Sequence, residues 1–245
     1  MSSIRRKPSG RWEARYRDAD GEQRGKTFDT KGAAREFLAS VRVEIQRGEY
    51  VDPNRGRVPV ESVSDDWLAS LVHLKPKTLI DYESALRCHV LPRLGRTAVG
   101  KIDQRRVRRF IADLLNDGVS AARVRKAVGT LRQILDLAVE DGLIRTNPCE
   151  GLKLPRMNQQ EMHFLTAEQV AMLAAAMPAQ YQLLVAFAAY TGLRVGEIAA
   201  LRARHIDLDR GRVMVVTAVS EVRGQLIEQD PKSYSSNVRS ACPAS

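Results

Sequence analysis

Residues 190–202 read YTGLRVGEIAALR and place one arginine between two glycines, directly before an apolar helix. The apolar run 183–189 just before this stretch predicts a buried helix. Gly192 permits the backbone turn that ends such a helix, because a residue with a Cβ resists that conformation. Apolar residues then recur at helical spacing, so the sequence predicts a second, inward-packing helix that begins at Arg194.

Arg194 is therefore a candidate anion-binding residue. It lies at the positive N-terminal end of the expected helix, where a guanidinium and free backbone N–H groups suit a phosphate. Glu197 follows three residues later, within helical reach, and can fix the direction of the guanidinium. The alternative is a structural arginine–glutamate pair, the commoner meaning of an isolated Arg-x-x-Glu. The residues alone leave both interpretations open.

A family resemblance bears on this choice. Residues 191–208, TGLRVGEIAALRARHIDL, resemble the first active-site arginine box of the tyrosine site-specific recombinases, the phage integrase family. The resemblance implies that Arg194 binds the scissile DNA phosphate and that Glu197 supports it. His205 stands where many family members carry an acid.

The resemblance covers nearly the whole chain in the order of the family. Residues 75–82, KPKTLIDY, followed by 89–95, HVLPRLG, resemble the start of the core-type DNA-binding domain. Residues 138–144, followed by Asn147-Pro148, resemble its closing helix. We accordingly expect DNA contacts from three residues of the first motif, Lys75, Lys77 and Thr78.

Bulk properties set broad limits on the protein. Its 245 residues are enough for two or three small domains, and 39 basic against 29 acidic residues give a net charge of +10. This charge suits a polyanionic partner but does not by itself establish nucleic-acid binding. The three cysteines are odd in number and widely spaced, so we expect reduced thiols and no metal site. Without a membrane-length apolar run or a signal-peptide core, the sequence predicts a soluble, cytoplasmic protein with no membrane partner.

The first segment, residues 4–52, contains two strand patterns at 11–17 and 23–28, followed by a helix from Lys31. On the first strand the basic residues share one face and the larger apolar residues share the other. The basic residues, which are either solvated or DNA-binding, are Arg11, Arg15 and Arg17. The resemblance implies a three-stranded sheet plus a helix, an arm-type DNA-binding domain at residues 1–55. We expect residues 52–57 to form a flexible linker.

The second segment is predicted to be entirely helical and to form the core-type DNA-binding domain, residues 60–155. Helices are expected from Ser64, from Lys77 to a stop at Pro92, after a cap at Asp103, and from 120 to 140. Outward basic residues of the last two helices form the densest basic cluster of the chain, and phosphate contact competes there with simple solvation. They are Arg105, Arg106, Arg108, Arg109, Arg123, Arg125 and Lys126.

The third segment, residues 162–245, is expected to be the first part of a mixed α/β recombinase catalytic domain. Thr166 can cap its first helix, and strands are predicted at 213–219 and 224–228. In the family a lysine on such a hairpin acts as general acid toward the leaving 5′ oxygen. By resemblance that role falls on Lys232, although a basic hairpin tip is the plainer interpretation.

The sequence departs from the family after this point. None of the four histidines begins a His-x-x-Arg box, and Tyr234 lies too close to Lys232 to be the family's nucleophile. In the full family reaction a tyrosine oxygen attacks a DNA phosphodiester and retains the 3′ phosphate, without ATP, a metal or another cofactor. We therefore expect a C-terminally truncated recombinase that lacks its covalent catalyst. Residues 235–245 resemble a frameshift seam, with programmed truncation and an incomplete gene as alternatives.

Together these patterns predict a mainly α fold with small β elements (α+β). Three functions fit: a prophage-type recombinase inactive by itself, a non-catalytic protein that competes with integrase at attachment sites, and a helical scaffold with solvated basic faces. The resemblance implies double-stranded DNA with arm-type and core-type sites as the partner. It also implies an oligomer on DNA, and a host bending protein or directionality factor as further partners.

Overall fold

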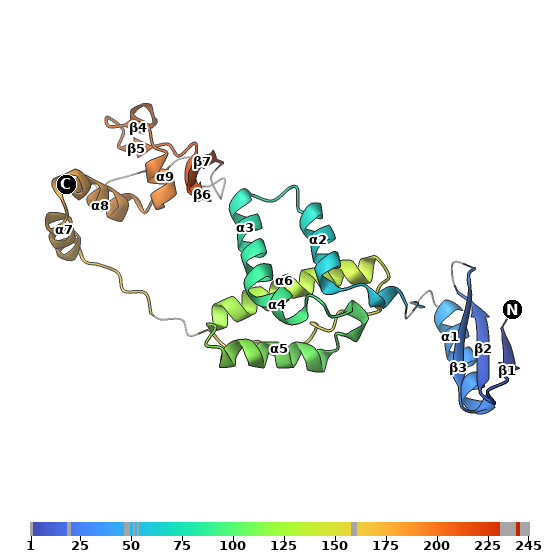
Figure 1. Ribbon diagram of the computed structural model, residues 1–245. Helices are drawn as coiled ribbons and strands as arrows, with labels where there is room; N and C mark the ends of the chain where they lie inside the picture. Colours follow the sequence, from blue (N-terminus) through green and yellow to red (C-terminus); the bar gives the residue numbers. More distant parts are fainter. Residues whose placement is uncertain are drawn as a thin grey trace. The chain divides into compact units, whose positions relative to one another are not determined.

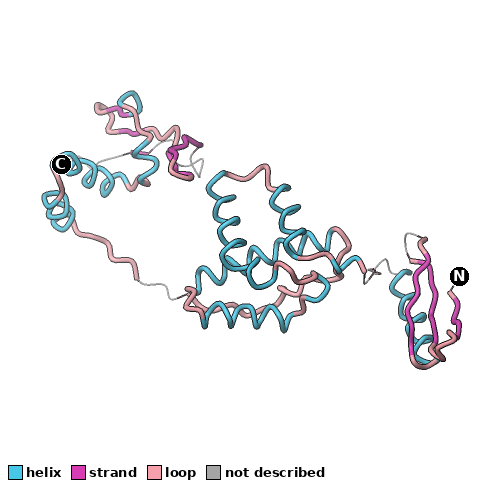
Figure 2. The backbone as a smooth tube through the Cα atoms, in the orientation of Figure 1, coloured by secondary structure: helices cyan, strands magenta, loops and turns pink. Residues whose placement is uncertain are grey.

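The computed structural model describes residues 2–18, 21–46, 50, 52, 54–157, 161–230 and 239–240 (Figures 1 and 2). It is mainly helical with small antiparallel sheets, which confirms the expected α+β class. The chain divides into two compact units, residues 1–74 with 81–157, and residues 75–80 with 158–245. None of the helices described is both long and apolar enough to cross a membrane.

The first unit begins with an antiparallel sheet covered by one helix. Its elements are β1 (Ser3–Arg6), β2 (Trp12–Arg17), β3 (Gln23–Phe28) and α1 (Lys31–Gln46). The strand order is β1-β2-β3, and Ala14 and Tyr16 of β2 are buried together with Ala34 and Val41 of α1. The predicted alternation of β2 is thus confirmed. The residue pattern showed only two strands, and the third was implied by the resemblance.

The expected flexible linker is wrong for its described residues. Asp52 is buried and forms an ion pair with Arg24 of β3, with 3.1 Å between Asp52 Oδ2 and Arg24 Nη2. The next residues form the helical turn η1 (Arg55–Arg57). A Cβ added to Gly56 would lie 3.1 Å from Gly100 Cα, so this backbone packs directly on the next segment. A buried carboxylate needs a cation, and a backbone in such close contact needs glycine. These two requirements hold the segment in place.

The rest of the first unit is a helical bundle. Its elements are α2 (Val60–Ser70), α3 (Pro76–Ala85), η2 (Leu86–Val90), α4 (Leu91–Leu94), η3 (Val99–Lys101), α5 (Gln104–Asn116) and α6 (Ala121–Glu140). The beginning of helix α3, up to Ile80, is grouped with the second unit. Its fully buried side chains include Trp67, Leu86, Leu114 and Leu131. Asp103 caps α5 as predicted, accepting from Arg106 N at 2.7 Å.

Two helix boundaries differ from the sequence prediction. The first helix begins at Val60, before the expected Ser64. The second was expected to stop at Pro92, but the chain stays helical through Pro92 to Leu94. Proline lacks the N–H that an α-helix interior uses. Here it lies in the first turn of α4, directly after the wide π turn η2, where that donor is not required.

The second unit contains a helical part and short strands. Its elements are α7 (Ala167–Ala176), α8 (Ala179–Thr191), α9 (Val195–Ala199), η4 (Ala203–His205), β4 (Ile206–Asp207), β5 (Arg212–Val213), β6 (Ala218–Val222), β7 (Gln225–Gln229) and β8 (Arg239–Ser240). A capping box of Thr166 and Gln169 begins α7, as expected. The predicted strand 213–219 is two short strands, because the chain leaves β5 at Val213 and pairs again only at Ala218.

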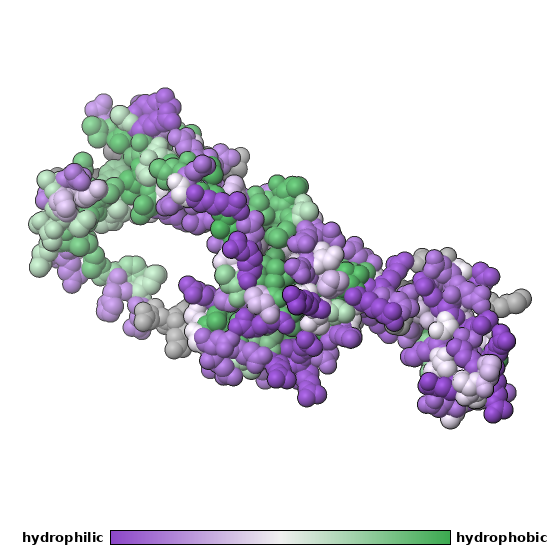
Figure 3. All heavy atoms as spheres, in the orientation of Figure 1, coloured by the Kyte–Doolittle hydropathy of each residue, from purple (hydrophilic) through white to green (hydrophobic). Residues whose placement is uncertain are grey.

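The apolar helix before the arginine is correct as a helix but not as a buried one. No residue of α8 is fully buried, and Leu183 is 77% exposed. Hydrophobic side chains gather on the visible surface of this unit in Figure 3. The hydrophobic core cluster of Leu193, Val213 and Val215 contacts α8 through Phe187, whereas other apolar side chains of α8 are exposed.

Candidate functional site

The turn that carries Arg194 is built by its neighbours. Gly192 ends α8 in the left-handed region at φ 63°, and its N–H donates to Ala188 O at 3.0 Å. The Thr191 hydroxyl donates to Phe187 O at 2.6 Å, which ties the turn back to the helix. The glycine turn predicted from sequence is confirmed, since only glycine adopts this φ without a steric cost.

Arg194 and Glu197 form a closely bonded pair. Arg194 Nη1 lies 2.9 Å from Glu197 Oε1, and Arg194 N donates to Glu197 Oε2 at 3.0 Å. The glutamate side chain is only 2% exposed, whereas the arginine side chain is 59% exposed. The carboxylate therefore fixes the guanidinium, which has five N–H donors in all, from the protein side. A structural pair and an anion-binding arginine are compatible in this geometry.

The helix after Arg194 is shorter than predicted. α9 spans only five residues, and Val195, expected to pack inward, is 81% exposed. Such a short helix has little macrodipole, so any anion affinity here comes from the guanidinium. Gly196 is required for a different reason, because an added Cβ would lie 2.3 Å from Val219 O of β6.

A hollow of about 290 Å³ lies beside Arg194 within the second unit. Lys75 and Lys77, which belong to this unit, line it together with Arg194. Lys75 Nζ donates to Asp230 O at 2.9 Å. Glu197 lines it as well, so four of the predicted site residues share one hollow. Lys232 and Tyr234 lie outside the described residues.

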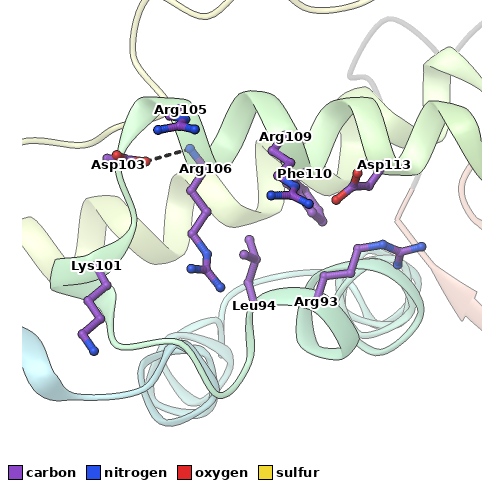
Figure 4. Close-up of a pocket in the computed structure, with 9 residues that line it drawn as sticks. All are labelled: Arg93, Leu94, Lys101, Asp103, Arg105, Arg106, Arg109, Phe110 and Asp113. Atoms are coloured by element: carbon purple, nitrogen blue, oxygen red, sulfur yellow. Dashed lines mark hydrogen bonds between the residues drawn. The ribbon is translucent and has the colours of Figure 1, made fainter.

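A second basic hollow lies in the helical bundle of the first unit. We call it the α5 hollow; it has a volume of about 420 Å³ (Figure 4). It is lined by Arg93, Leu94, Lys101, Asp103, Arg105, Arg106, Arg109, Phe110 and Asp113. Arg106 Nη2 donates to Thr97 Oγ1 at 3.0 Å, and Arg93 pairs with Asp117. Among the described residues, Lys101, Arg105 and Arg109 form no ion pair, so these three charges can meet an external anion.

The predicted basic cluster of the two helices is divided in the structure. Lys126 pairs with Asp81 of α3 at 2.7 Å, and Arg125 donates to Pro155 O at 3.2 Å. The α5 hollow instead combines the α5 arginines with Arg93 and Lys101, which the sequence did not single out. In the sequence, Arg93 and Lys101 are marked only as basic residues that precede α5. Their spacing along the chain does not show that they line one hollow with the α5 arginines.

The basic residues of the N-terminal sheet lie on the face opposite α1. Arg15 Nε donates to Glu13 Oε2 at 2.8 Å, and Lys7 Nζ lies 3.3 Å from Glu13 Oε1. The hydrogen bond from Arg15 lowers the pKa of Glu13. Partial desolvation raises this pKa, and the hydrogen bond from Lys7 lowers it further, so the net shift is downward. Arg11 pairs with Asp29 at 2.9 Å, and Arg17 Nη1 donates to Gly21 O at 3.0 Å.

The described residues contain no cluster of three or more histidine, cysteine, aspartate or glutamate side chains that could hold a metal ion. The arginine and lysine side chains that line the two hollows make anion binding the candidate chemistry of the described part. Three surfaces carry it: the sheet face, the α5 hollow and the hollow beside Arg194.

Comparison with known proteins identifies the family. Residues 2–47 match the phage integrase N-terminal domain, and residues 60–115 match the phage integrase N-terminal SAM-like domain. A protein of Mycobacterium tuberculosis named prophage phiRv2 integrase is 31% identical over 240 residues, covering 94% of this chain and 62% of that relative. The integrase of Mycobacterium phage D29 is 28% identical, covering 86% of this chain and 58% of the phage protein.

The chain belongs to the phage integrase family of tyrosine recombinases. Solved structures of two other integrases share its fold. The Tn1549 transposon integrase in complex with transposon right-end DNA gives a TM-score of 0.65 at 17% identity, over 73% of this chain and 59% of that one. The lambda integrase dimer bound to a core site gives 0.56 at 21% identity, over 93% of this chain and 65% of that one.

Within the chain the first match covers β1 to α1, which carry the sheet face, and the second match covers residues 60–115, which include the lining of the α5 hollow. Arg194 lies beyond both matches, in the region shared with the full-length relatives. The chain spans about three fifths of the length of the curated relatives it matches first.

Proposed function

We propose that this chain binds attachment-site DNA as part of a site-specific recombination system, and that Arg194 holds the scissile phosphate. The observation that supports this most is the Arg194–Glu197 pair, in which a buried carboxylate orients an exposed guanidinium at a glycine turn. Negative charge grows on the free phosphate oxygens during strand transfer, and a cation fixed in advance stabilises it without reorganisation.

The domain roles belong to the same proposal. Residues 1–55 bind arm-type DNA through the sheet face, and residues 60–155 bind core-type DNA. Residues 162–245 form the first part of the catalytic domain. Support comes from the family-model matches and from the solved relatives, which include a lambda integrase dimer on a core site and a tetramer on a Holliday junction. We accordingly propose an oligomer on DNA.

The proposed residue roles follow the family pattern. Arg194 binds the phosphate, Glu197 positions Arg194, and Lys232 is the general acid toward the leaving 5′ oxygen. Lys75, Lys77 and Thr78 contact DNA near this site. Elsewhere the DNA contacts are Arg11, Arg15, Arg17, Arg105, Arg106, Arg109, Arg123, Arg125 and Lys126. No metal or other cofactor takes part.

A second candidate function is DNA binding without cleavage, in competition with an intact integrase at attachment sites. The observation that favours it is that the sheet face and the α5 hollow belong to the first unit, whereas Arg194 belongs to the second. Binding through these two surfaces does not require the Arg194 site.

One experiment separates these functions. The full chain is incubated with a labelled duplex that carries the candidate attachment site and a nick that traps a covalent intermediate, and the products are resolved on a denaturing gel. A mobility shift is measured in parallel over a range of salt. A covalent band that disappears in Arg194→Ala supports recombinase chemistry, and a salt-sensitive shift without that band supports the competitor. The absence of any shift would contradict both.

A further inference from the structure

The sheet face contains one arginine whose surroundings differ from those of the others. Arg15 lies at the middle of β2, and its cross-strand neighbours are Ser3 on β1 and Gly25 on β3. Both neighbours are small, so no long side chain stands directly beside it. A molecule laid on this face can approach the guanidinium closely.

The hydrogen bond to Glu13 leaves the useful end of Arg15 available. Glu13 Oε2 accepts from Nε, at the base of the guanidinium. Among the described residues, the two terminal nitrogens donate to no protein acceptor. Two parallel N–H groups at that end match O6 and N7 of guanine, the pair of acceptors that arginine contacts bidentately in the major groove.

Glu13 is itself held from its other side. Lys7 Nζ lies 3.3 Å from Glu13 Oε1 and donates to Thr27 Oγ1 of β3 at 3.2 Å. The carboxylate side chain is only 16% exposed, between the two cations. Because Glu13 is fixed at both oxygens, it restricts the rotamers of Arg15 before any ligand arrives, which lowers the entropy cost of binding.

The other two arginines of this face are arranged differently. Arg17 uses a terminal nitrogen, Nη1, on the Gly21 carbonyl, so its fork is partly occupied. Arg11 pairs with Asp29, whose side chain is 84% exposed, and a solvated pair of this kind restrains geometry little. These two are suited to phosphate contacts, which require charge more than direction.

Gly25 provides an independent indication. Its φ does not lie in the left-handed region, and an added Cβ would meet only ordinary contacts, the nearest being Glu13 Oε1 at 3.5 Å. The fold therefore does not require glycine at this position. Glycine instead keeps open the space beside Arg15.

We propose that Arg15 reads a guanine in the major groove and that Glu13 is the positioning residue that directs its guanidinium to the base. This inference rests on the proposed DNA-binding function. It adds that the N-terminal sheet discriminates between sequences, and that an acidic residue on a DNA-facing surface contributes to this discrimination.

The test uses the full chain and a pool of 40-bp duplexes with a randomised centre. Bound duplexes are sequenced, and the affinity for one unselected duplex is measured by fluorescence anisotropy. The chain should enrich a G·C pair at one position, and Arg15→Lys, which keeps the charge but loses the fork, should reduce that enrichment at least about fivefold.

Glu13→Gln gives the diagnostic result. Removing one negative charge from a DNA-facing surface should raise affinity for the unselected duplex. Replacing the charge-assisted positioning bond by a weaker bond to an amide oxygen should lower guanine enrichment. Asp29→Asn is the matched control, because it removes the same charge from the Arg11 pair and should raise affinity without changing the enrichment. Gly25→Val adds bulk beside both Glu13 and Arg15 and should also lower the enrichment. Circular dichroism checks the fold of each variant.

The outcomes are distinguishable. If the chain binds the unselected duplex but Arg15→Lys keeps the guanine enrichment, or if Glu13→Gln and Asp29→Asn behave alike, the inference is wrong and the proposed function stands. If the chain binds no duplex in any salt, the proposed function fails and the inference fails with it.

Discussion

Arg194 and Glu197 differ in burial, and this difference explains how one pair serves both structure and binding. The buried carboxylate accepts from the Arg194 backbone and from its guanidinium, so the acid holds the turn together. The exposed arginine contributes a directed charge. A buried acid of this kind is stable only while its acceptors are satisfied, so a loss of Arg194 affects the fold of the turn as well as any ligand.

Gly196 gives the sharpest steric prediction. In Gly196→Ala the new Cβ would lie 2.3 Å from the Val219 carbonyl oxygen, which is backbone and cannot turn aside. We expect a loss of about 1–3 kcal/mol in local stability as α9 moves away from β6. Hydrogen exchange of peptides from α9 and β6 should become faster by a corresponding factor.

The matched control is Gly129→Ala in the middle of α6, where an added Cβ meets nothing within 4 Å. This change should stabilise the first unit by about 0.5–1 kcal/mol, because glycine is a poor helix residue. Unaltered exchange in Gly196→Ala would mean that the α9–β6 contact does not persist in solution.

The two described cysteines predict a difference in reactivity. Burial raises the pKa of the Cys149 thiol to about 12, and the nearby Asp136 carboxylate adds to the effect, whereas Cys88 is exposed. Only the thiolate is the nucleophile, so in a Cys242→Ser variant at pH 8 iodoacetamide should modify Cys88 and leave Cys149 intact. Peptide mass spectrometry measures this. Rapid labelling of Cys149 without denaturant would contradict the buried environment.

The same pKa shift has a direction in pH. Because the folded pKa of Cys149 is raised above the unfolded value, the protonated thiol is favoured by folding. This contribution is complete below the ordinary thiol pKa and is lost as the pH rises from about 9 toward 12. Alkaline unfolding of the first unit should therefore shift to higher pH in Cys149→Ala, if the smaller side chain is tolerated in the core.

At the scale of helices and strands, the sequence predicted what periodicity and capping encode. The apolar spacing of α5 and α6, the Asp103 cap and the alternation of β2 all depend on neighbours within one element, and each is confirmed. The errors concern contacts between elements. Pro92 continues a helix because of the π turn before it, and the 52–57 segment is fixed by Arg24 and by Gly100.

The candidate site divides in the same way. Arg194 and its glycine turn were predicted from local residues and a family motif. The grouping of Arg93 and Lys101 with the α5 arginines was not, because it depends on α4 packing beside α5. Burial of α8 was predicted from its composition and is wrong for the described structure, since composition shows that a helix is apolar but not whether anything covers it.

The cap of α5 yields a test at this scale. Asp103→Ala removes the carboxylate that accepts from Arg106 N, and we expect a loss of about 1 kcal/mol in the unfolding free energy. Urea unfolding measures it, followed by tryptophan fluorescence in a Trp12→Phe background so that the signal comes from Trp67. Ser120→Ala is the matched control, because Ser120 occupies the cap position of α6 without a side-chain cap bond and should change stability little. Equal losses in the two variants would argue against the cap.

For the whole molecule, the net charge of +10 does not show which basic residues are available to bind DNA. Many basic residues are already paired with acids, including Arg24, Arg93 and Lys126. Cations without an acidic partner among the described residues, such as Lys101, Arg105 and Arg109 of the α5 hollow, are better placed to displace counterions from a nucleic acid. Salt dependence is therefore a more informative measurement than affinity at one salt concentration.

The α5 hollow predicts the size of that dependence. If Arg105 and Arg109 each contact a phosphate of duplex DNA, the double variant Arg105→Ala/Arg109→Ala should reduce the slope of log K against log salt by about 1.8, at roughly 0.9 for each contact. Lys153→Ala/Arg156→Ala removes two exposed charges outside the proposed contacts and should leave the slope nearly unchanged. Equal slopes for the two double variants would remove the α5 hollow from the DNA interface.

The fixed segment between the sheet and the bundle has a consequence for avidity. Asp52 is tied to β3, Gly56 packs on the backbone at Gly100, and Arg55 N donates to Asp52 O at 3.0 Å, so little free chain separates these anchors. For the proposed two-site DNA binding, engagement of one site would convert the second into an intramolecular event at an effective concentration in the millimolar range. Two individually weak duplex contacts would then act as one strong one.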